Sequence, residues 1–407
     1  MEEWKEYKIG DIAKTNISQY SLSENWKAIQ YLDTGSITKN HISSIEEYFD
    51  NNDLPSRARR KVKHGDIVYS CVRPNLCHYG YMDNPPSNLL VSTGFAVITA
   101  ASNLADARYL YYFLTQNNIV QSLHAIGEQA ASTYPSIKPS DIEDLSISLP
   151  PLLIQRKIVA ILKSLDDKIE INRRINENLE QQVQALFKSW FVDFEPFHDK
   201  PFVESELGMI PVDWEIVSLA DLMNYSGGSQ PSASEFIEEA REGYVRFVQI
   251  RDYASDSHIT YIPVSRKNKI CEERDIMIAR YGASLGRICY GIDGAYNVAL
   301  AKVLPLKDYY IEFLRCYLNT RVFYEGINQK GNRAVQAGFN KSDIQSFKLP
   351  FPKDENLVRM FNQICSSFFE KRLLLDKESR VLSNIRDTLL PRLMSGELEI
   401  QDIEESL

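Results

Sequence analysis

The hydrophobic pattern divides the chain into segments of short β-like runs and two long helical stretches. The first helical stretch follows Pro150 and Pro151, which suit a helix start, and continues into an aromatic run that ends at Phe194. Lys168, Asn172 and Gln182 interrupt its apolar pattern. The apolar residues themselves recur at heptad spacing, as in a coiled-coil seam: Ile158, Ile161, Leu165, Ile175, Leu179 and Leu186.

The second helical stretch runs from about Asn356 to Leu390, where Pro391 is expected to interrupt it. Two narrow seams in one chain predict an antiparallel helix pair, because the segment between them lets the chain return. Such a pair would place the two β-rich segments at opposite ends, related by an approximate two-fold rotation. In the alternative, each helix packs only against its own domain. The second seam comprises Phe361, Ile364, Phe368, Leu375, Leu382, Ile385 and Leu389.

Four short sequences recur in the same order in the two halves of the chain. "WKEYKIGDIAK" from Trp4 is similar to "WEIVSLADLMN" from Trp214, and "HGDIVYSCVRP" is similar to "ERDIMIARYGA". "ARYLYYFLTQ" matches "IEFLRCYLNT", and "IKPSDIEDLSISLPPL" matches "FNKSDIQSFKLPFP". Colinear matches of this kind indicate an internal duplication. The predicted fold class is α/β (α+β), with two similar globular domains separated by two long antiparallel coiled-coil helices.

The duplication and the helical pattern together set the expected domain boundaries. The first domain spans residues 1–150, and the second spans residues 213–352. The first helix covers 151–194, a linker covers 195–212, and the second helix with the C-terminal segment covers 353–407.

Composition narrows the class of protein. The 407 residues carry a formal net charge of −9, which argues against a protein that coats nucleic acid by bulk electrostatics. No apolar run is long enough to span a membrane, and the acidic, polar start is not that of a signal peptide. The six cysteines form no CxxC pair, so zinc binding is not expected. Free cysteines without a leader favour a reducing, cytoplasmic location.

A search for catalytic motifs finds little. The sequence contains no phosphate-binding loop, no G-x-S-x-G elbow and no HExxH pair. "DNPPS", from Asp83 to Ser87, is similar to the Asn-Pro-Pro-aromatic motif of DNA amino-methyltransferases, but Ser87 replaces the aromatic residue. A stand-alone DNA methyltransferase therefore stays as an alternative, and a Pro-Pro turn between strands is the structural explanation. We expect no metal site.

Basic and amide side chains in expected loops are the candidate chemistry. Arg, Asn and Gln can read base edges, and Lys and Arg hold phosphates. "RARRKVK", from Arg57, carries five cations in seven residues and is the strongest candidate for phosphate contact. The DNA-binding candidates are Lys39, Asn40, Arg57, Arg59, Arg60, Lys61, Arg73, Asn75, Tyr134, Gln230, Arg246, Arg251, Arg280, Arg287, Lys330, Asn332, Arg333 and Gln336.

Over essentially its whole length the chain resembles the specificity subunits of type I restriction–modification systems. The resemblance rests on "LPPLLIQRKIVAILKSLDDKIEINRRINENLE", "ALFKSWFVDFEPF", "LGMIPVDWEIVSLADL" and "LLPRLMSGELEI" taken together. It implies two target recognition domains, each reading one half of a bipartite, asymmetric site in double-stranded DNA. It also implies that the helices set the unread gap between the half-sites and that this chain catalyses nothing.

The partners that the resemblance implies are two modification subunits, which bind S-adenosylmethionine and methylate adenine N6. With two restriction subunits added, the assembly also translocates and cuts DNA using ATP and Mg²⁺. No cofactor is expected in this chain. A coiled-coil scaffold without a DNA role is a further alternative.

The aromatic run "ALFKSWFVDF" has two interpretations. The helix end packs against the second domain, or it forms a docking surface for a modification subunit, since large aromatic side chains anchor interfaces. The residues concerned are Leu186, Phe187, Trp190, Phe191 and Phe194.

Overall fold

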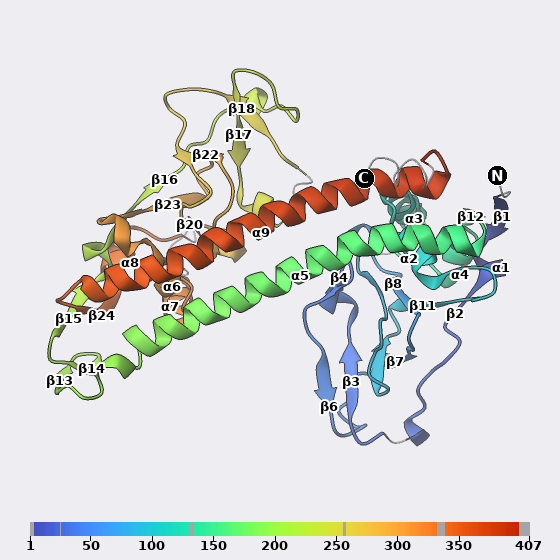
Figure 1. The fold of residues 1–407 in the computed structure, drawn as a ribbon, viewed down its shortest axis with the longest axis horizontal. Helices are drawn as coiled ribbons and strands as arrows, with labels where there is room; N and C mark the ends of the chain where they lie inside the picture. The colour runs from blue at the N-terminus through green and yellow to red at the C-terminus, as the bar shows by residue number, and fades with distance from the viewer. Residues whose placement is uncertain (1–3, 25, 130–133, 255–257, 332–337, 399–407) are drawn as a thin grey trace. The chain divides into compact units, whose positions relative to one another are not determined.

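The computed structural model describes residues 4–24, 26–129, 134–254, 258–331 and 338–398. They form two compact units, Met1–Ile169 with Arg380–Leu407 and Glu170–Ser379. Each unit contains one globular domain and one half of each long helix (Figure 1). The division therefore falls within the helices rather than at their ends.

The first domain contains two four-stranded sheets. One has the order β6-β3-β10-β7 and the other β2-β11-β8-β9, while β1 pairs with β12. The strands are β1 (Lys5–Lys8), β2 (Ala13–Thr15), β3 (Ile29–Leu32), β4 (Ile37–Thr38), β5 (His41–Ile42), β6 (Glu46–Tyr48), β7 (Ala58–Lys61), β8 (Ile67–Ser70), β9 (Tyr79–Tyr81), β10 (Leu89–Ser92), β11 (Phe95–Ala100) and β12 (Ser146–Leu149). The helices are α1 (Ile9–Ile12), α2 (Ala107–Thr115), α3 (Asn117–Gln129) and α4 (Pro139–Glu143).

The alternation of side chains along β8 places them in two of the three cores of this domain. Val68 on β8 packs with Leu32 and Val91 in the cluster that lies between the sheets. Its neighbours Ile67 and Tyr69 point the other way, into the cluster formed with α2, α3 and α4. Successive residues of a strand face opposite sides of a sheet, so β8 is buried on both faces, as its continuous apolar run requires.

The second domain repeats this plan. Its sheets have the orders β18-β17-β22-β19 and β16-β23-β20-β21, and β15 pairs with β24. The strands are β15 (Trp214–Ser218), β16 (Met223–Gly227), β17 (Tyr244–Val248), β18 (Tyr261–Pro263), β19 (Ile270–Cys271), β20 (Met277–Ala279), β21 (Ile288–Cys289), β22 (Gly294–Tyr296), β23 (Leu300–Pro305) and β24 (Lys348–Pro352). The helices are α6 (Ile311–Leu318), α7 (Arg321–Gly331) and α8 (Lys341–Gln345).

Strand direction matches as well as strand order. The central pairs β3–β10 and β17–β22 are parallel, whereas the pairs that flank them are antiparallel. Two sheets that match in order and direction support the duplication read from the sequence. A hairpin of β13 (Phe202–Ser205) and β14 (Gly208–Pro211) occupies the stretch expected as a linker.

The long helices are α5 (Leu152–Phe191) and α9 (Asn356–Ser395). In the second unit Asn172 donates to Glu378 (2.7 Å) and Asn176 donates to Asp376 (2.6 Å), so the residue numbers run in opposite directions. In the first unit Arg386 donates to Asp166 (2.8 Å). The halves of α5 and α9 are therefore antiparallel in each unit (Figure 1).

Three residues of the predicted seam are off by one position. Ile175, Ile364 and Ile385 are 37%, 39% and 42% exposed. Each precedes by one residue a position that faces the partner helix or the core, which are Asn176, Cys365 and Arg386. The sequence analysis favoured isoleucine over the neighbouring polar residue, but at two of these positions the seam is polar. The other predicted seam residues are buried or half-buried.

Two further expectations for the helices are corrected. Pro391 does not interrupt α9, which continues to Ser395. The aromatic run at the end of α5 belongs to the core of the second unit, where Phe187 and Phe191 are each 3% exposed and Phe194 is buried. Leu186 and Trp190 pack partly buried against the same core. The docking interpretation is therefore wrong for the three phenylalanines, because their rings already contact the second domain.

Candidate nucleic-acid interface

Five of the predicted residues come together in the first domain. The β4–β5 hairpin turns at Lys39 and Asn40, both with positive φ, as the tight hairpin turn requires. The Lys39 N–H donates to the Cys77 carbonyl (2.9 Å), and Asn40 Oδ1 accepts from the Tyr81 N–H (2.7 Å). These bonds fix the hairpin tip beside the loop that carries Arg73 and Asn75.

Arg73 is held by the loop that follows α3. Its N–H donates to the Pro135 carbonyl (2.9 Å), Val72 bridges to Ser136, and its guanidinium lies 4.7 Å from the centre of the Tyr134 ring. Arg73 and Lys39 are exposed and form no ion pair with another described residue. An exposed cation stacked on an aromatic ring beside amide side chains is suited to nucleic-acid contact.

The basic run from Arg57 does not form one patch. It lies in and around β7, whose side chains alternate between the two faces of the sheet. Lys61 is paired with Glu24 (2.5 Å) and lies over Trp26, while Arg60 is half-buried. Burial lowers the pKa of Arg60, whose Nε and Nη1 have no partner among the described residues. Arg59 is half-buried and donates to the Ala58 carbonyl (2.9 Å), which leaves Arg57 as the exposed arginine of the run.

In the second domain, Arg280 lies in an aromatic cage. It follows β20 directly, and its N–H donates to the Ala299 carbonyl (2.8 Å). Its guanidinium carbon lies 5.0 Å from the Tyr281 ring centre and 5.9 Å from those of Tyr225 and Phe339. The sequence analysis identified Arg280 but missed this cage, because its rings come from three separate segments of the chain.

The remaining predicted residues of this domain are dispersed. Gln230, Arg251 and Arg287 are exposed, and Arg246 is half-buried on β17. Lys330 donates to the Ser346 hydroxyl (2.5 Å) and lies over Phe347, so it is engaged within the domain. Asn332, Arg333 and Gln336 lie outside the described residues.

A surface hollow of about 530 Å³ lies beside Arg287, where the 3₁₀ turn after β20 meets the α6–α7 connection. Ser284, Asn319 and Thr320 line it together with Arg321, which is paired with Glu325 (2.6 Å). No sequence motif marked these residues, since they come from two segments far apart in the chain. The hollow therefore has a mixed lining, because Ala283, Ile288 and Leu318 lie beside these hydroxyl, amide and guanidinium groups.

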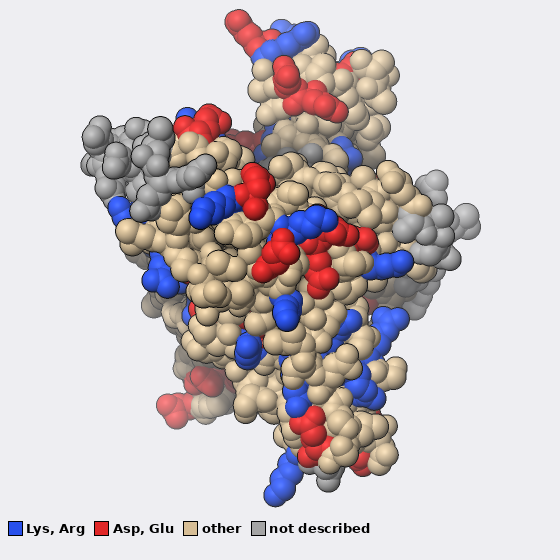
Figure 2. All heavy atoms as spheres, turned by 90° about the vertical axis from the view of Figure 1, so that its right-hand side faces the viewer, with Lys and Arg blue, Asp and Glu red and all other residues tan. Residues whose placement is uncertain are grey.

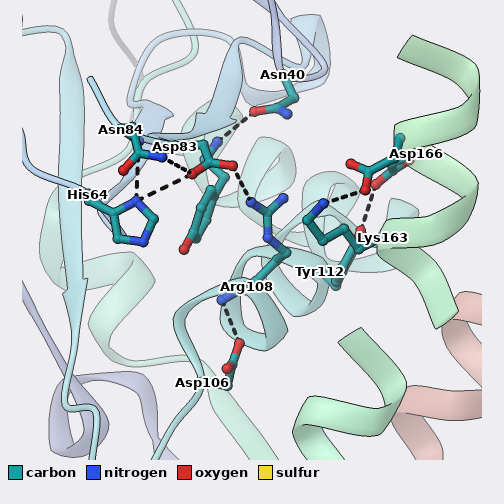
Figure 3. A network of polar contacts seen from close by, with 11 residues as sticks. Asn40, His64, Asp83, Asn84, Asp106, Arg108, Tyr112, Lys163 and Asp166 are labelled. Atoms are coloured by element: carbon teal, nitrogen blue, oxygen red, sulfur yellow. Dashed lines mark hydrogen bonds and ion pairs between the residues drawn. The ribbon is translucent and has the colours of Figure 1, made fainter. Parts of the chain in front are cut away.

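The "DNPPS" segment forms a turn that is stabilised by an ion pair and by hydrogen bonds (Figure 3). Asp83 accepts from Arg108 (3.2 Å) and lies 3.4 Å from His64, and the Asn84 amide donates to Asp83 (3.2 Å). Arg108 also stacks on Tyr81 at 3.9 Å. The amide that a methyltransferase would aim at a base is instead bonded to its neighbour, which supports the structural explanation of the turn.

Among the described residues, no three His, Cys, Asp or Glu side chains are arranged to hold a metal ion. The six cysteines are free thiols, and burial raises the pKa of Cys71 to about 11. Within the same residues, no helix is both long and apolar enough to cross a membrane. Figure 2 shows basic and acidic side chains interspersed on the face that it draws, rather than a patch of one sign.

Comparison with known proteins places the chain in a family. The family model described as the type I restriction modification DNA specificity domain matches residues 1–181 and 211–372. The chain is 28% identical to the type I restriction enzyme HindI specificity subunit of Haemophilus influenzae, over 98% of this chain and 100% of that protein. It is 27% identical to the MjaIX specificity subunit of Methanocaldococcus jannaschii, over 97% of this chain and 93% of that protein.

A solved structure of a type I restriction–modification system S subunit from M. genitalium is 18% identical over 96% of both chains, with a TM-score of 0.55, which shows a shared fold. The family match covers both globular domains, most of α5 and the first part of α9. The chain therefore belongs to the type I restriction–modification specificity subunits and carries two copies of their DNA specificity domain.

Proposed function

We propose that each domain reads one half of a bipartite, asymmetric site in double-stranded DNA and that α5 and α9 set the gap between the half-sites. The observation that carries the proposal is that two domains with the same backbone plan present different polar side chains. The two domains share strand order and direction, yet one presents Arg73 on Tyr134 and the other presents Arg280 in a three-ring cage. Two domains with the same fold and different surface side chains suit two different half-sites.

In this proposal the chain directs chemistry that other subunits perform. Two modification subunits bind S-adenosylmethionine and methylate adenine N6, and restriction subunits, where present, use ATP and Mg²⁺ to translocate and cut DNA. The chain itself catalyses nothing and holds no cofactor. In the "DNPPS" turn, Asp83 is paired with Arg108 and the Asn84 amide donates to Asp83, so these groups have structural roles, which supports this division of labour.

The test is to co-express the chain with its modification subunit and to map N6-methyladenine in host DNA. A single split motif with a fixed gap is the expected result. Lengthening α5 and α9 by one turn each, about four residues, should change the gap and leave both half-sites as they were. An assembled complex that methylates no split motif would contradict the proposal. Binding of S-adenosylmethionine by the isolated chain would favour the methyltransferase alternative.

The helix pair also offers a surface for a modification subunit. On α9 the exposed Met360, Ile364 and Leu374 lie on one stripe at coiled-coil spacing, with the polar Ser367 and Lys371 between them, and this stripe is distinct from the buried one that holds Phe361 and Cys365. Leu374 is 61% exposed. A second apolar stripe on a helix whose first stripe is already buried favours packing against a further helix. We place modification-subunit docking here instead of on the aromatic end of α5.

Substituting Leu374→Glu should reduce co-purification of the modification subunit by at least about tenfold, since a charge would replace an apolar anchor. The matched control is Val264→Glu, which alters a similarly exposed apolar residue (67% exposed) outside the helices. Equal retention of the modification subunit by both variants would place docking elsewhere.

A further inference from the structure

Arg280 has an environment unlike that of an ordinary surface arginine. The side chain is half-buried, its Nε is shielded from solvent without a hydrogen-bond partner, and it forms no ion pair with the described residues. A buried polar group without a partner costs free energy. A cation kept in that state in an otherwise acidic chain therefore points to a partner that arrives from outside.

The guanidinium of Arg280 lies against Gly227 on β16, where there is no room for a larger residue. A Cβ atom at this position would lie only 2.8 Å from Arg280 Nη1. The backbone next to Arg280 is fixed on both sides, by the bond to Ala299 and by the bridge from Tyr281 to Gly338. Glycine at 227 therefore lets the planar group lie close against β16.

We propose that Arg280 reads a guanine in one half-site through its guanidinium fork, with Tyr225, Tyr281 and Phe339 holding the fork in place. This assignment rests on the proposed function. An arginine can donate two parallel hydrogen bonds to guanine O6 and N7 in the major groove. A phosphate contact requires only charge at the end of a mobile side chain, whereas a base edge requires an oriented plane. The rings and Gly227 supply that orientation before DNA binds, which reduces the entropy lost on binding.

The test uses the complete complex of this chain with its modification subunit. Methylation motifs are mapped, and binding is measured on duplexes that differ at single base pairs. Arg280→Ala should relax the guanine preference at one position of one half-site by about 10- to 100-fold, and the other half-site should keep its bases. Arg280→Lys should retain overall affinity but lose the same preference, since an ammonium cannot form the planar pair.

Gly227→Ala displaces the guanidinium of Arg280 without removing it, so it should weaken the guanine preference at the same position of the half-site. The matched control is Arg359→Ala, which removes another arginine of the second unit that is stacked on a tyrosine (3.6 Å from the Tyr309 ring centre) and should leave the motif intact.

Three outcomes separate the assignments. Unchanged half-site bases in Arg280→Ala, with a split motif still present, would overturn the guanine assignment alone. A uniform loss of affinity on all sequences with a shallower salt dependence would overturn it in favour of a phosphate contact. A wild-type complex without a split motif would overturn the proposed function and this assignment together.

Discussion

The two domains have the same backbone plan but differ at the position that follows the central strand of the second sheet. In the first domain this position is Cys71, whose N–H donates to the Gly94 carbonyl (2.8 Å). In the second it is Arg280, whose N–H donates to the Ala299 carbonyl at the same distance. The backbone bond is identical, and the side chain changes from a small thiol to a caged cation. The strand pairing therefore tolerates a change that alters surface chemistry completely.

The two units also differ in the side chains that anchor the ends of the long helices. The end of α5 is anchored in the second unit by the rings of Phe187 and Phe191, whereas the end of α9 is anchored in the first unit by Leu390 and Leu393. Aromatic and aliphatic anchors occupy corresponding places. Three sets of substitutions test how far the two domains are equivalent.

The largest effect is expected from Phe191→Ala. The ring lies 4.9 Å from Phe313 and 5.1 Å from Phe361, so its loss should lower the free energy of unfolding of the second unit by about 3–5 kcal/mol. Leu393→Ala, the matched change at the end of α9, should cost the first unit about 2–5 kcal/mol. Hydrogen exchange resolved by segment, combined with urea unfolding, measures both. If either variant lowered protection from hydrogen exchange equally in both units, the effects of Phe191 and Leu393 would not be confined to their own units.

A smaller loss is expected from breaking a buried ion pair that only the second domain has. Arg315 donates to Glu312 (3.0 Å) within α6, both side chains are at most 5% exposed, and the equivalent positions of α2 hold Arg108 and Tyr111. Arg315→Met should cost about 3 kcal/mol, because it leaves Glu312 buried and unpaired. The double variant Glu312→Leu, Arg315→Met should recover most of that loss. Additive losses in urea unfolding would show that the two charges are independent.

The smallest effect concerns pH and the starts of the two long helices. Glu355 precedes α9 and accepts from Lys307 (2.6 Å) and Tyr310 (2.8 Å), while Gln155 in α5 bonds the Asp106 N–H (2.8 Å) without charge. The hydrogen bond from Lys307, aided by those from Tyr309 and Tyr310, lowers the pKa of Glu355 to about 2. The ordinary value is about 4.3.

Because the folded pKa is depressed, this contact stabilises the second unit above about pH 4.3 and is lost as the pH falls towards 2. Glu355→Gln should therefore reduce the loss of stability of the second unit at acid pH. Urea unfolding midpoints measured from pH 7 to pH 2.5 would show this. The effect is small because the ion pair is open to solvent. Gln155→Ala should shift the first unit's midpoint equally at every pH, and a pH-dependent shift there would contradict the comparison.

Much of the fold could be predicted from the sequence because its evidence is local or repeated. The matches of "HGDIVYSCVRP" with "ERDIMIARYGA" indicated the duplication, and prolines and heptads indicated the two helices. The seam residues were harder to identify, because a helix with two apolar stripes offers two adjacent frames. Ile364 belongs to the exposed stripe of α9, and only the packing of the second unit's core decides that Cys365 faces inward.

The sequence by itself determined that there are two related domains, two long helices and a set of polar loop residues, because periodicity and repetition are written along the chain. Only the tertiary structure decided which of those residues share a surface. It buried the aromatic end of α5, split the basic run across β7 and enclosed Arg280 with rings from three segments. The physical reason is that burial and orientation depend on contacts between residues far apart in sequence, which no local pattern records.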